Sequence, residues 1–413
     1  MNLPDSDSED ELPPGWEERV TCDGSVFYAN HLTKATQWTH PRTGKKKRVS
    51  GDLPFGWERC IDKNTGKVIY VDHENRRTTY TDPRLAFAVE EKEHVNDFRQ
   101  RFDASSTALQ VLHGRDLNGK LAVITGANAG IGFETARSLA RHGCTVVMAC
   151  RNLVAAEEAI NQIREDKQQA GENCVAIHLD LTLLASVVQF SNIIKSKYDK
   201  IDMLILNAGV FGLPYTKTPD GFETTFQVNH LSHFYLSLLL RPLLVTGSRV
   251  VVVSSESHRY ANLTVDNMSP LTLSPDMASR YWDMMAYQNS KLCNILFARM
   301  LAKKLQRDGI SVFSLHPGNM VSSKLARNWW IYRLLFALVR PFTKSLQQAA
   351  STTVYCATGL ELAGVTGDYF NNCCRCQESA AARDDQLAAA LWDTSLDMVQ
   401  NVLGNNAPGL EPL

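Results

Sequence analysis

From residue 118 onward, two kinds of hydrophobic pattern alternate along the chain. Short apolar runs, bounded by polar residues, predict buried parallel strands at residues 121–125, 145–150, 174–178, 203–207, 249–254 and 311–315. Between these runs, apolar residues recur at the three- and four-residue spacing of an amphipathic helix. Strands that alternate with helices predict an α/β domain with a doubly wound parallel sheet, which we place at residues 118–413.

The N-terminal region has a different pattern, and it is repeated. Residues 12–17 (LPPGWE) return as residues 53–58 (LPFGWE), and residues 26–31 (VFYANH) return as residues 68–73 (VIYVDH). Each repeat is too short for an ordinary core and contains three strand-like runs separated by polar turns. We therefore expect two small three-stranded all-β modules, at residues 11–44 and 52–85. A charged, weakly periodic connector follows at residues 86–117.

Both repeats resemble WW domains, a family named for two tryptophans, here Trp16 and Trp38. The resemblance implies a proline-rich ligand in the polyproline II form. Because side chains alternate between the faces of a strand, Phe27 and His31 should share one face with Trp38. Phe27 and Trp38 are expected to form the proline slot, with Thr36 at its edge. By resemblance, His31 recognises the tyrosine of Pro-Pro-x-Tyr ligands.

The second repeat departs from this pattern. Ile69 replaces the first aromatic residue of the slot, and Tyr80 replaces the second tryptophan. Aromatic contacts contribute about 0.5–1.5 kcal/mol beyond burial, so this slot has lost part of its stacking energy. We expect the second module to support the first rather than to bind peptides independently.

A basic block, Lys45–Arg48, joins the two modules. Such a block in an exposed linker is a candidate nuclear import signal. The alternative is a solvated spacer, and the sequence alone leaves both interpretations open.

Composition narrows the class of protein. The 413 residues exceed one ordinary domain, and the formal net charge of −1 gives no indication of direct nucleic-acid binding. The ten cysteines lack the spacing of an extracellular disulfide framework and are expected to be reduced thiols. Cys373 and Cys376 have no second ligand pair nearby, so no metal site is expected. The acidic first residues exclude a signal peptide, and no apolar run reaches the roughly 18 residues of a transmembrane helix.

The strongest candidate for chemistry is the glycine loop at residues 125–132 (TGANAGIG). It follows the predicted strand at residues 121–125 and begins a helix, so its backbone N–H groups would face a pyrophosphate. Gly126 allows the tight turn, Gly130 lets the backbone approach the phosphates, and Gly132 lets the helix pack close to the strand. The sequence therefore predicts a dinucleotide site.

Residues from about 118 to 410 resemble the short-chain dehydrogenase/reductase family, and seven motifs in the family's order carry the resemblance. They are Thr125, Gly126, Asn128, Gly130, Ile131 and Gly132 of the loop; Asp180-Leu181; Asn207-Ala208-Gly209; Asn229; Ser255; Tyr287-x-x-x-Lys291; and Pro317-Gly318. The resemblance implies that the cofactor is bound by the glycine loop, Asp180-Leu181, the Asn-Ala-Gly turn, Lys291 and Pro317-Gly318. It also implies that Tyr287, Lys291, Ser255 and Asn229 are catalytic.

The chemistry explains these residue types. The ordinary pKa of tyrosine, near 10, is too high for a base at neutral pH, whereas a nearby cation favours the phenolate. Lys291 follows Tyr287 by four residues and should lie on the same helix face. By resemblance, Lys291 also holds the nicotinamide ribose, Ser255 binds the substrate oxygen, and Asn229 orders a water in the proton path.

Two features of the site stay open. Ser254, Ser255 and Ser257 all follow the fifth strand, and Ser255 is chosen by position. The long interval at residues 260–285 is expected to form a substrate-side loop. The threonine usual at the carboxamide position is missing from residues 319–323, which leaves the nicotinamide contacts open.

Cofactor preference depends on the residue after the second strand. An NAD enzyme places a carboxylate there for the ribose hydroxyl, but this chain has Arg151 and no acid. NADP is therefore expected rather than NAD, and the alternative is that Arg151 pairs elsewhere on the surface. Ala129 stands where some NADP enzymes of the family carry a second basic residue.

An apolar helix with two arginines is expected at residues 329–342. It resembles the same stretch in retinol-dehydrogenase-like members of the family. It would either cover a lipophilic substrate or contact a membrane surface.

The order of two WW-like modules and one reductase domain is unusual. Resemblance to reductases with this order implies location in cytoplasm and nucleus, association with mitochondrion and Golgi, and roles in apoptosis and Wnt signalling. Two hypotheses follow. The chain is either an NADP-dependent oxidoreductase of a steroid- or retinoid-like alcohol, recruited to Pro-Pro-x-Tyr proteins, or a scaffold whose reductase domain holds cofactor with little turnover.

Overall fold

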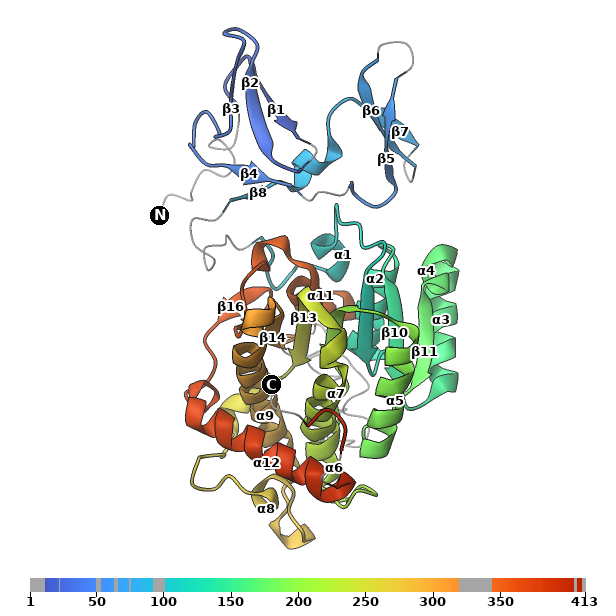
Figure 1. Ribbon diagram of the computed structural model, residues 1–413, viewed down its shortest axis with the longest axis vertical. Coiled ribbons are helices and arrows are strands. Elements are labelled where there is room, and N and C mark those ends of the chain that lie inside the picture. The colour runs from blue at the N-terminus through green and yellow to red at the C-terminus, as the bar shows by residue number, and fades with distance from the viewer. Residues whose placement is uncertain are drawn as a thin grey trace. The chain divides into compact units, whose positions relative to one another are not determined.

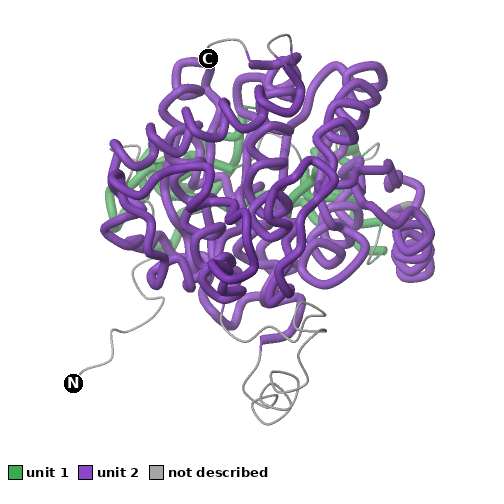
Figure 2. Tube along the Cα trace, turned by 90° about the horizontal axis from the view of Figure 1, so that it is seen from below, with its two compact units in different colours: residues 1–99, 113–117 green, residues 100–112, 118–413 purple. Residues whose placement is uncertain are grey.

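The computed structural model describes residues 12–21, 23–49, 53–62, 66–73, 76–91, 101–318, 344–404 and 407–410. The chain divides into two compact units, which Figure 2 colours separately. One unit is Met1–Arg99 with His113–Leu117, and the other is Gln100–Leu112 with Asn118–Leu413. The helix expected at residues 329–342 lies outside the described residues.

The first module is a three-stranded antiparallel sheet (Figure 1) of β1 (Trp16–Val20), β2 (Val26–Asn30) and β3 (Ala35–Gln37). Its small core contains Val26, Tyr28 and Val49, with Trp16 packed against them. Alternation along β2 puts Tyr28 into this core, where it is fully buried, and leaves Phe27 on the opposite face. The predicted all-β module is confirmed.

The basic block is not a free linker, which corrects the expectation from sequence. Lys47 and Arg48 form β4 (Lys47–Arg48), which pairs antiparallel with β8 (Val89–Glu90). The Nζ of Lys45 lies 2.8 Å from the Glu90 carboxylate. The pattern of four consecutive basic residues did not indicate this pairing because its partner strand lies about forty residues further along the chain.

The second module has the same topology, with β5 (Trp57–Ile61), β6 (Val68–Asp72) and β7 (Arg77–Thr79). Its buried Tyr70 donates a hydrogen bond of 2.8 Å to Asp82. Arg84, on the short 3-10 helix η1 (Pro83–Phe87), pairs with the same carboxylate at 2.8 Å. Asp82 is buried, and a buried carboxylate needs such hydrogen-bonding and charged partners.

The second unit contains an eight-stranded sheet in the order β11-β10-β9-β12-β13-β14-β15-β16. The strands are β9 (Leu121–Thr125), β10 (Thr145–Cys150), β11 (Cys174–His178), β12 (Ile201–Leu206), β13 (Leu244–Val253), β14 (Ser311–His316), β15 (Tyr369–Asn371) and β16 (Cys374–Cys376). All neighbours are parallel except the β15–β16 hairpin. The doubly wound parallel sheet is confirmed. The chain reverses its winding between β9 and β12, and ligands bind at such a switch point.

Helices connect the strands and cover the sheet (Figure 1). They are α1 (Ala108–Val111), α2 (Gly130–Ala140), α3 (Leu153–Asp166), α4 (Gln168–Glu172), α5 (Leu184–Lys197), α6 (Thr224–Phe226), α7 (Ser232–Leu240), α8 (Pro270–Leu273), α9 (Asp283–Leu305), α11 (Leu346–Thr358) and α12 (Asp385–Leu403). Helix α1, from the predicted connector, packs on α2 and α11.

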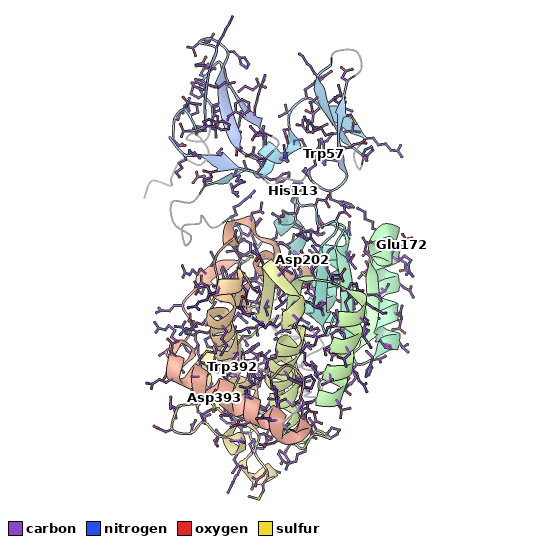
Figure 3. The ribbon with its side chains drawn as sticks, in the orientation of Figure 1. Trp57, His113, Glu172, Asp202, Trp392 and Asp393 are labelled. Carbon is purple, nitrogen blue, oxygen red and sulfur yellow. The ribbon has the colours of Figure 1, made fainter. Side chains whose placement is uncertain are left out.

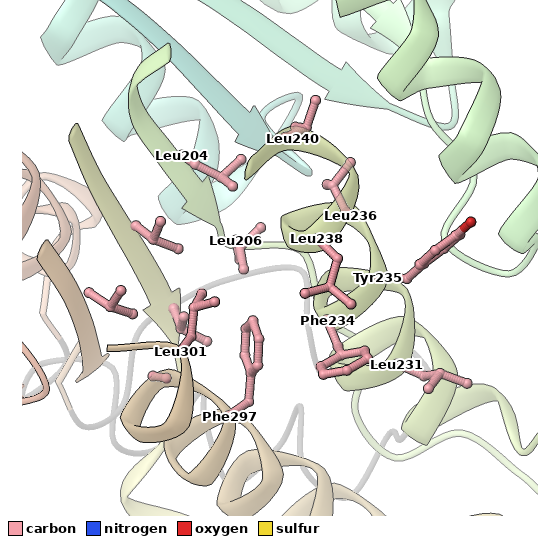
Figure 4. Close-up of a cluster of buried hydrophobic side chains, with 14 of the residues drawn as sticks. Leu204, Leu206, Leu231, Phe234, Tyr235, Leu236, Leu238, Leu240, Phe297 and Leu301 are labelled. Carbon is pink, nitrogen blue, oxygen red and sulfur yellow. The ribbon is translucent and has the colours of Figure 1, made fainter. Parts of the chain in front are cut away.

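The main core lies between the sheet and the helices α5, α7, α9 and α12. In Figure 4, Leu204 and Leu206 of β12 face Phe234 of α7 and Phe297 of α9, which meet edge to face at 5.6 Å between ring centroids. Trp392 of α12, labelled in Figure 3, adds a further edge contact to Phe234 at 4.9 Å. This aromatic packing fixes α9, which carries Tyr287 and Lys291, and α7, which directly follows the turn that carries Asn229.

Candidate active site

The glycine loop packs closely against the start of α2 and the Asn-Ala-Gly turn. Gly126 has a φ of 65°, in the left-handed region, and a Cβ there would lie 3.0 Å from the Cβ of Ala208. A Cβ on Gly132 would lie 2.5 Å from the carbonyl oxygen of Gly126. Helix α2 begins directly after the loop and no side chain caps its N-terminus. Its first N–H groups therefore remain available for a phosphate.

Thr125 joins the loop to the Asn-Ala-Gly turn after β12. The backbone N–H groups of Asn207 and Ala208 donate to Thr125 Oγ1 at 2.9 and 3.0 Å. The side-chain amide of Asn207 donates a hydrogen bond of 2.9 Å to the carbonyl oxygen of Thr125. The two motifs are about eighty residues apart in sequence and form one corner of the site.

Other predicted cofactor residues lie at the carboxyl ends of neighbouring strands. Arg151 directly follows β10, is exposed, and has no ion-pair partner among the described residues. Asp180 follows β11 and accepts from Thr182, while Leu181 is buried beside it. Pro317 and Gly318 end β14. Asn128 lies within the loop, and Ile131 lies in the first turn of α2.

Asn229 lies in a π-helical turn, Gln227–Leu231, that leads into α7. Such turns occur preferentially at functional sites because they redirect side chains. The Asn229 amide accepts from Val210 N at 2.7 Å and donates to Val210 O at 3.0 Å and to Ser290 Oγ at 3.0 Å. The amide thus holds the segment after the Asn-Ala-Gly turn against α9.

Tyr287 and Lys291 lie one turn apart on α9, and both are buried. The Nζ of Lys291 is 5.6 Å from the centre of the Tyr287 ring and donates to Val253 O at 3.1 Å. A Cβ on Gly209 would lie 3.3 Å from Asn229 Oδ1 and 3.5 Å from Lys291 Nζ. Gly209 is therefore the point where the turn, Asn229 and Lys291 converge.

The three serines after β13 have different environments. Ser254 donates to the carbonyl oxygen of Lys291 at 2.7 Å, so its hydroxyl is used in packing. Ser255 Oγ accepts from Ser257 N at 3.2 Å, and Ser255 is near enough to the Tyr287 phenol to lower its pKa. No contact with the phenol is found for Ser257 among the described residues. The geometry favours Ser255 as the partner of Tyr287.

The pKa values of the pair differ from the expectation. Burial raises the pKa of Tyr287 to about 12, against the smaller effect of Ser255, and burial lowers the pKa of Lys291 to about 8. In the free protein, burial thus outweighs any acidifying effect of the Lys291 cation on Tyr287. The sequence pattern shows that the two residues are neighbours, but it does not report the desolvation of a fully buried pair.

One aromatic side chain contacts Tyr287, and two others pair with each other at the predicted substrate-side loop. Phe211 meets the Tyr287 ring edge to face, with centroids 4.8 Å apart. Within the predicted substrate-side loop, Tyr281 donates to Leu213 O at 2.8 Å, and its ring lies 5.5 Å from that of Tyr215. The loop contains α8 and a short 3-10 turn, Ala278–Arg280.

Two buried histidines near the site were missed by the sequence analysis. His233 contacts Thr125 Oγ1 and the carbonyl oxygen of Asn229, at 2.9 and 3.1 Å. His258 contacts the carbonyl oxygen of Ser255 at 2.7 Å and accepts from Ser379 N at 3.2 Å. Their spacing in the sequence could have identified them. His233 follows Asn229 by four residues and His258 follows Ser255 by three, so each lies about one helical turn from a predicted catalytic residue.

The two aromatic residues of the peptide slot predicted on the first module are in contact. Phe27 and Trp38 meet edge to face at 5.9 Å, and Trp38 is 55% exposed. His31 is exposed and forms a 2.8 Å hydrogen bond with Glu17. Thr36, on β3, is also exposed. In the second module the exposed Tyr80 bonds instead to Asp62 at 3.1 Å.

Within the described ranges, no helix combines the length and hydropathy needed to cross a bilayer. In the same ranges, no three His, Cys, Asp or Glu side chains gather as a metal-binding group.

The fold, the glycine loop and the buried Tyr287–Lys291 pair define a nicotinamide-dependent reductase of the short-chain class. The model of the short chain dehydrogenase family matches residues 120–266, and that of the WW domain matches residues 12–41 and 53–83. The loop fits the pyrophosphate of such a cofactor, because no side chain caps the N-terminus of α2 and its first N–H groups remain available.

Comparisons over the whole chain are more specific. A "WW domain-containing oxidoreductase" from Drosophila melanogaster is 58% identical over 97% of this chain and 98% of its own length. "Retinol dehydrogenase 12" from Mus musculus is 41% identical over 68% of this chain and 86% of its own length. A solved structure of an uncharacterised protein from Mycobacterium paratuberculosis has 30% identity and a TM-score of 0.56, covering 72% of this chain and 97% of its own. The chain belongs to the family of WW domain-containing oxidoreductases.

Proposed function

We propose that this protein uses NADP to interconvert a lipophilic alcohol and its carbonyl compound, of steroid- or retinoid-like character, and that its first WW domain recruits it to Pro-Pro-x-Tyr proteins. The convergence of Asn229 and Lys291 at Gly209, with Tyr287 beside Lys291 and Ser255 near the Tyr287 phenol, carries the proposal. The direct test is NADPH consumption by the purified full-length protein with lipophilic ketones and aldehydes.

A bound nicotinamide would supply or accept the hydride. In reduction, Tyr287 donates the phenolic proton to the carbonyl oxygen, and the raised pKa of its phenol keeps that proton in place beforehand. Ser255 hydrogen-bonds the same oxygen. Lys291 holds the cofactor ribose, and its cation favours the phenolate that forms once the proton has left. Asn229 fixes the neighbouring backbone and orders the water that returns the proton.

The substrate class follows from the approach to Tyr287. Phe211 lies against Tyr287, and Tyr215 and Tyr281 pair with each other at the predicted substrate-side loop, so aromatic surface suited to an apolar molecule is present. A relative named retinol dehydrogenase, with 41% identity over the reductase region, supports the same class.

Arg151 is proposed to bind the 2′-phosphate of NADP. Arg151→Asp should shift the ratio of the NADPH and NADH dissociation constants by roughly ten- to hundred-fold towards NADH, because a charge-assisted hydrogen bond of about 1.5–3 kcal/mol is lost. Fluorescence titration of both cofactors measures the ratio. Arg141→Asp, at the C-terminal end of α2, is the matched control, because it makes the same change of charge. An unchanged ratio in Arg151→Asp would refute the assignment.

The competing proposal is a scaffold whose reductase domain holds cofactor without turnover. The buried Lys291 argues against it, because burying an ammonium group is costly and a purely structural core would not need it. A scaffold would bind NADPH but show no carbonyl-dependent consumption above that of Tyr287→Phe.

Peptide binding is proposed for the first WW domain. Trp38→Ala should weaken binding of a Pro-Pro-x-Tyr peptide at least about tenfold, because the exposed indole forms half of the proline slot. Tyr80→Ala, the equivalent change in the second module, should alter binding less than about twofold, since Tyr80 bonds to Asp62 within its own module. Calorimetry on the full chain measures both. Equal losses would contradict the proposed difference between the modules.

Location and cellular role are proposed from the resemblance: cytoplasm and nucleus, with mitochondrion and Golgi association, and roles in apoptosis and Wnt signalling. Import by Lys45–Arg48 would require release of the β4–β8 pairing or recognition of the block in its paired form. Imaging of a variant with Lys45 and Lys46 changed to Gln tests the import proposal. Unchanged nuclear signal would refute it.

A further inference from the structure

His233 lies on α7, one helical turn after Asn229, and is buried with 1% exposure. Its Nδ1 faces the main-chain carbonyl oxygen of Asn229 at 3.1 Å. Its Nε2 faces the hydroxyl of Thr125 at 2.9 Å. One imidazole thus contacts a predicted catalytic residue and the first residue of the cofactor loop.

These contacts determine where the ring proton lies. A carbonyl oxygen can only accept, so Nδ1 carries the hydrogen and donates it to Asn229. Nε2 of a neutral ring then accepts from the Thr125 hydroxyl. Burial and the nearby Lys291 cation lower the pKa of His233 to about 4, so the ring stays neutral at physiological pH.

The direction of the Thr125 hydroxyl decides what its oxygen can do. With its hydrogen donated to His233, the oxygen keeps both lone pairs for the backbone N–H groups of Asn207 and Ala208, at 2.9 and 3.0 Å. All donors and acceptors in this chain of four bonds are matched. Without His233, the Thr125 hydrogen would be buried without this acceptor or would turn towards one of the two N–H groups.

We infer that His233, as its Nδ1–H tautomer, is a positioning residue that locks the cofactor loop, the Asn-Ala-Gly turn and the Asn229 turn into one geometry. The inference rests on the proposed function for its effect on cofactor binding. The tautomer itself follows from the contacts alone.

The chain offers a matched control in His230. It is also fully buried, lies three residues earlier, and its Nε2 contacts Ser395 Oγ on α12 at 3.1 Å. Burial lowers the pKa of His230 to about 3. His230→Phe therefore removes a comparable neutral histidine without touching the cofactor corner.

The tautomer is tested on the wild-type protein by NMR with ¹⁵N-labelled histidine. We expect a protonated Nδ1 and an unprotonated Nε2 for His233 at pH 7, with the signal assigned by its loss in His233→Phe or His233→Gln. An Nε2–H tautomer or a doubly protonated ring would overturn the inference. This readout does not depend on turnover or on cofactor binding.

The consequence is tested by NADPH titration of full-length variants. His233→Phe should weaken NADPH about tenfold, the effect of leaving one buried donor unpaired, while His230→Phe should change it less than about twofold. His233→Gln, whose amide oxygen can accept from Thr125, should recover affinity to within about threefold of wild type. Equal affinities in the two Phe variants would overturn the inference. Absence of any nicotinamide binding by wild type would instead refute the proposed function, and the NMR result would still decide the inference.

Discussion

Tyr287→Phe is expected to lower carbonyl reduction by the full-length protein roughly 10²- to 10⁴-fold, the range for loss of a general acid. The affinity for NADPH should stay within about twofold of wild type, because the phenol contributes only its proton. Steady-state assay with NADPH and a lipophilic ketone, together with fluorescence titration of NADPH, measures both effects.

Tyr235→Phe is the matched control for this change. It removes another buried tyrosine hydroxyl, which donates to Pro408 O at 3.0 Å outside the proposed active site. Its turnover should stay near that of wild type. Turnover that survives in Tyr287→Phe would mean that another acid, near Ser254 to Ser257, donates the proton, and the mechanism proposed above would be wrong.

Lys291→Met is expected to abolish turnover and yet stabilise the cofactor-free protein by about 3 kcal/mol. The pKa of Lys291 falls from an ordinary 10.5 to about 8 on burial, and each pH unit corresponds to about 1.4 kcal/mol. Methionine fills a similar volume without a charge. Val253 O, the acceptor of Lys291, keeps a 3.2 Å bond from Asn294. Denaturant unfolding at pH 7 measures the gain.

The pH dependence provides a separate check on this cause. Below pH 8 the lysine is protonated in both folded and unfolded chains, so the full cost of burying the charge is present. Between about pH 8 and 10.5 only the unfolded chain still holds the proton, so wild-type stability rises with pH. The advantage of Lys291→Met should therefore shrink over that window. An advantage that stays constant to pH 10.5 would contradict desolvation as its cause.

Several parts of the fold could be predicted because their patterns are local. The apolar runs at residues 121–125 and 145–150 match β9 and β10, since parallel strands buried on both faces are apolar throughout. The glycine loop was recognisable because its glycines are dictated by space, as Gly132 shows. The spacing of Tyr287 and Lys291 likewise required one helix face.

Other parts depend on partners that are distant in sequence. Lys47 and Arg48 pair with a strand that starts at Val89, and α1 packs against α11, more than two hundred residues away. His233 belongs to none of the sequence motifs, and only the fold brings it to Thr125. The raised pKa of Tyr287 comes from complete burial, which depends on the packing of the whole domain.

The measurement that tests the central proposal most directly is carbonyl-dependent NADPH oxidation by purified full-length protein, screened over lipophilic ketones and aldehydes beside Tyr287→Phe. We predict that at least one apolar carbonyl compound gives oxidation that Tyr287→Phe reduces at least about a hundredfold while both proteins bind NADPH equally. Equal NADPH binding with no oxidation above the Tyr287→Phe background, for every carbonyl compound screened, would contradict the proposal and favour a cofactor-holding scaffold.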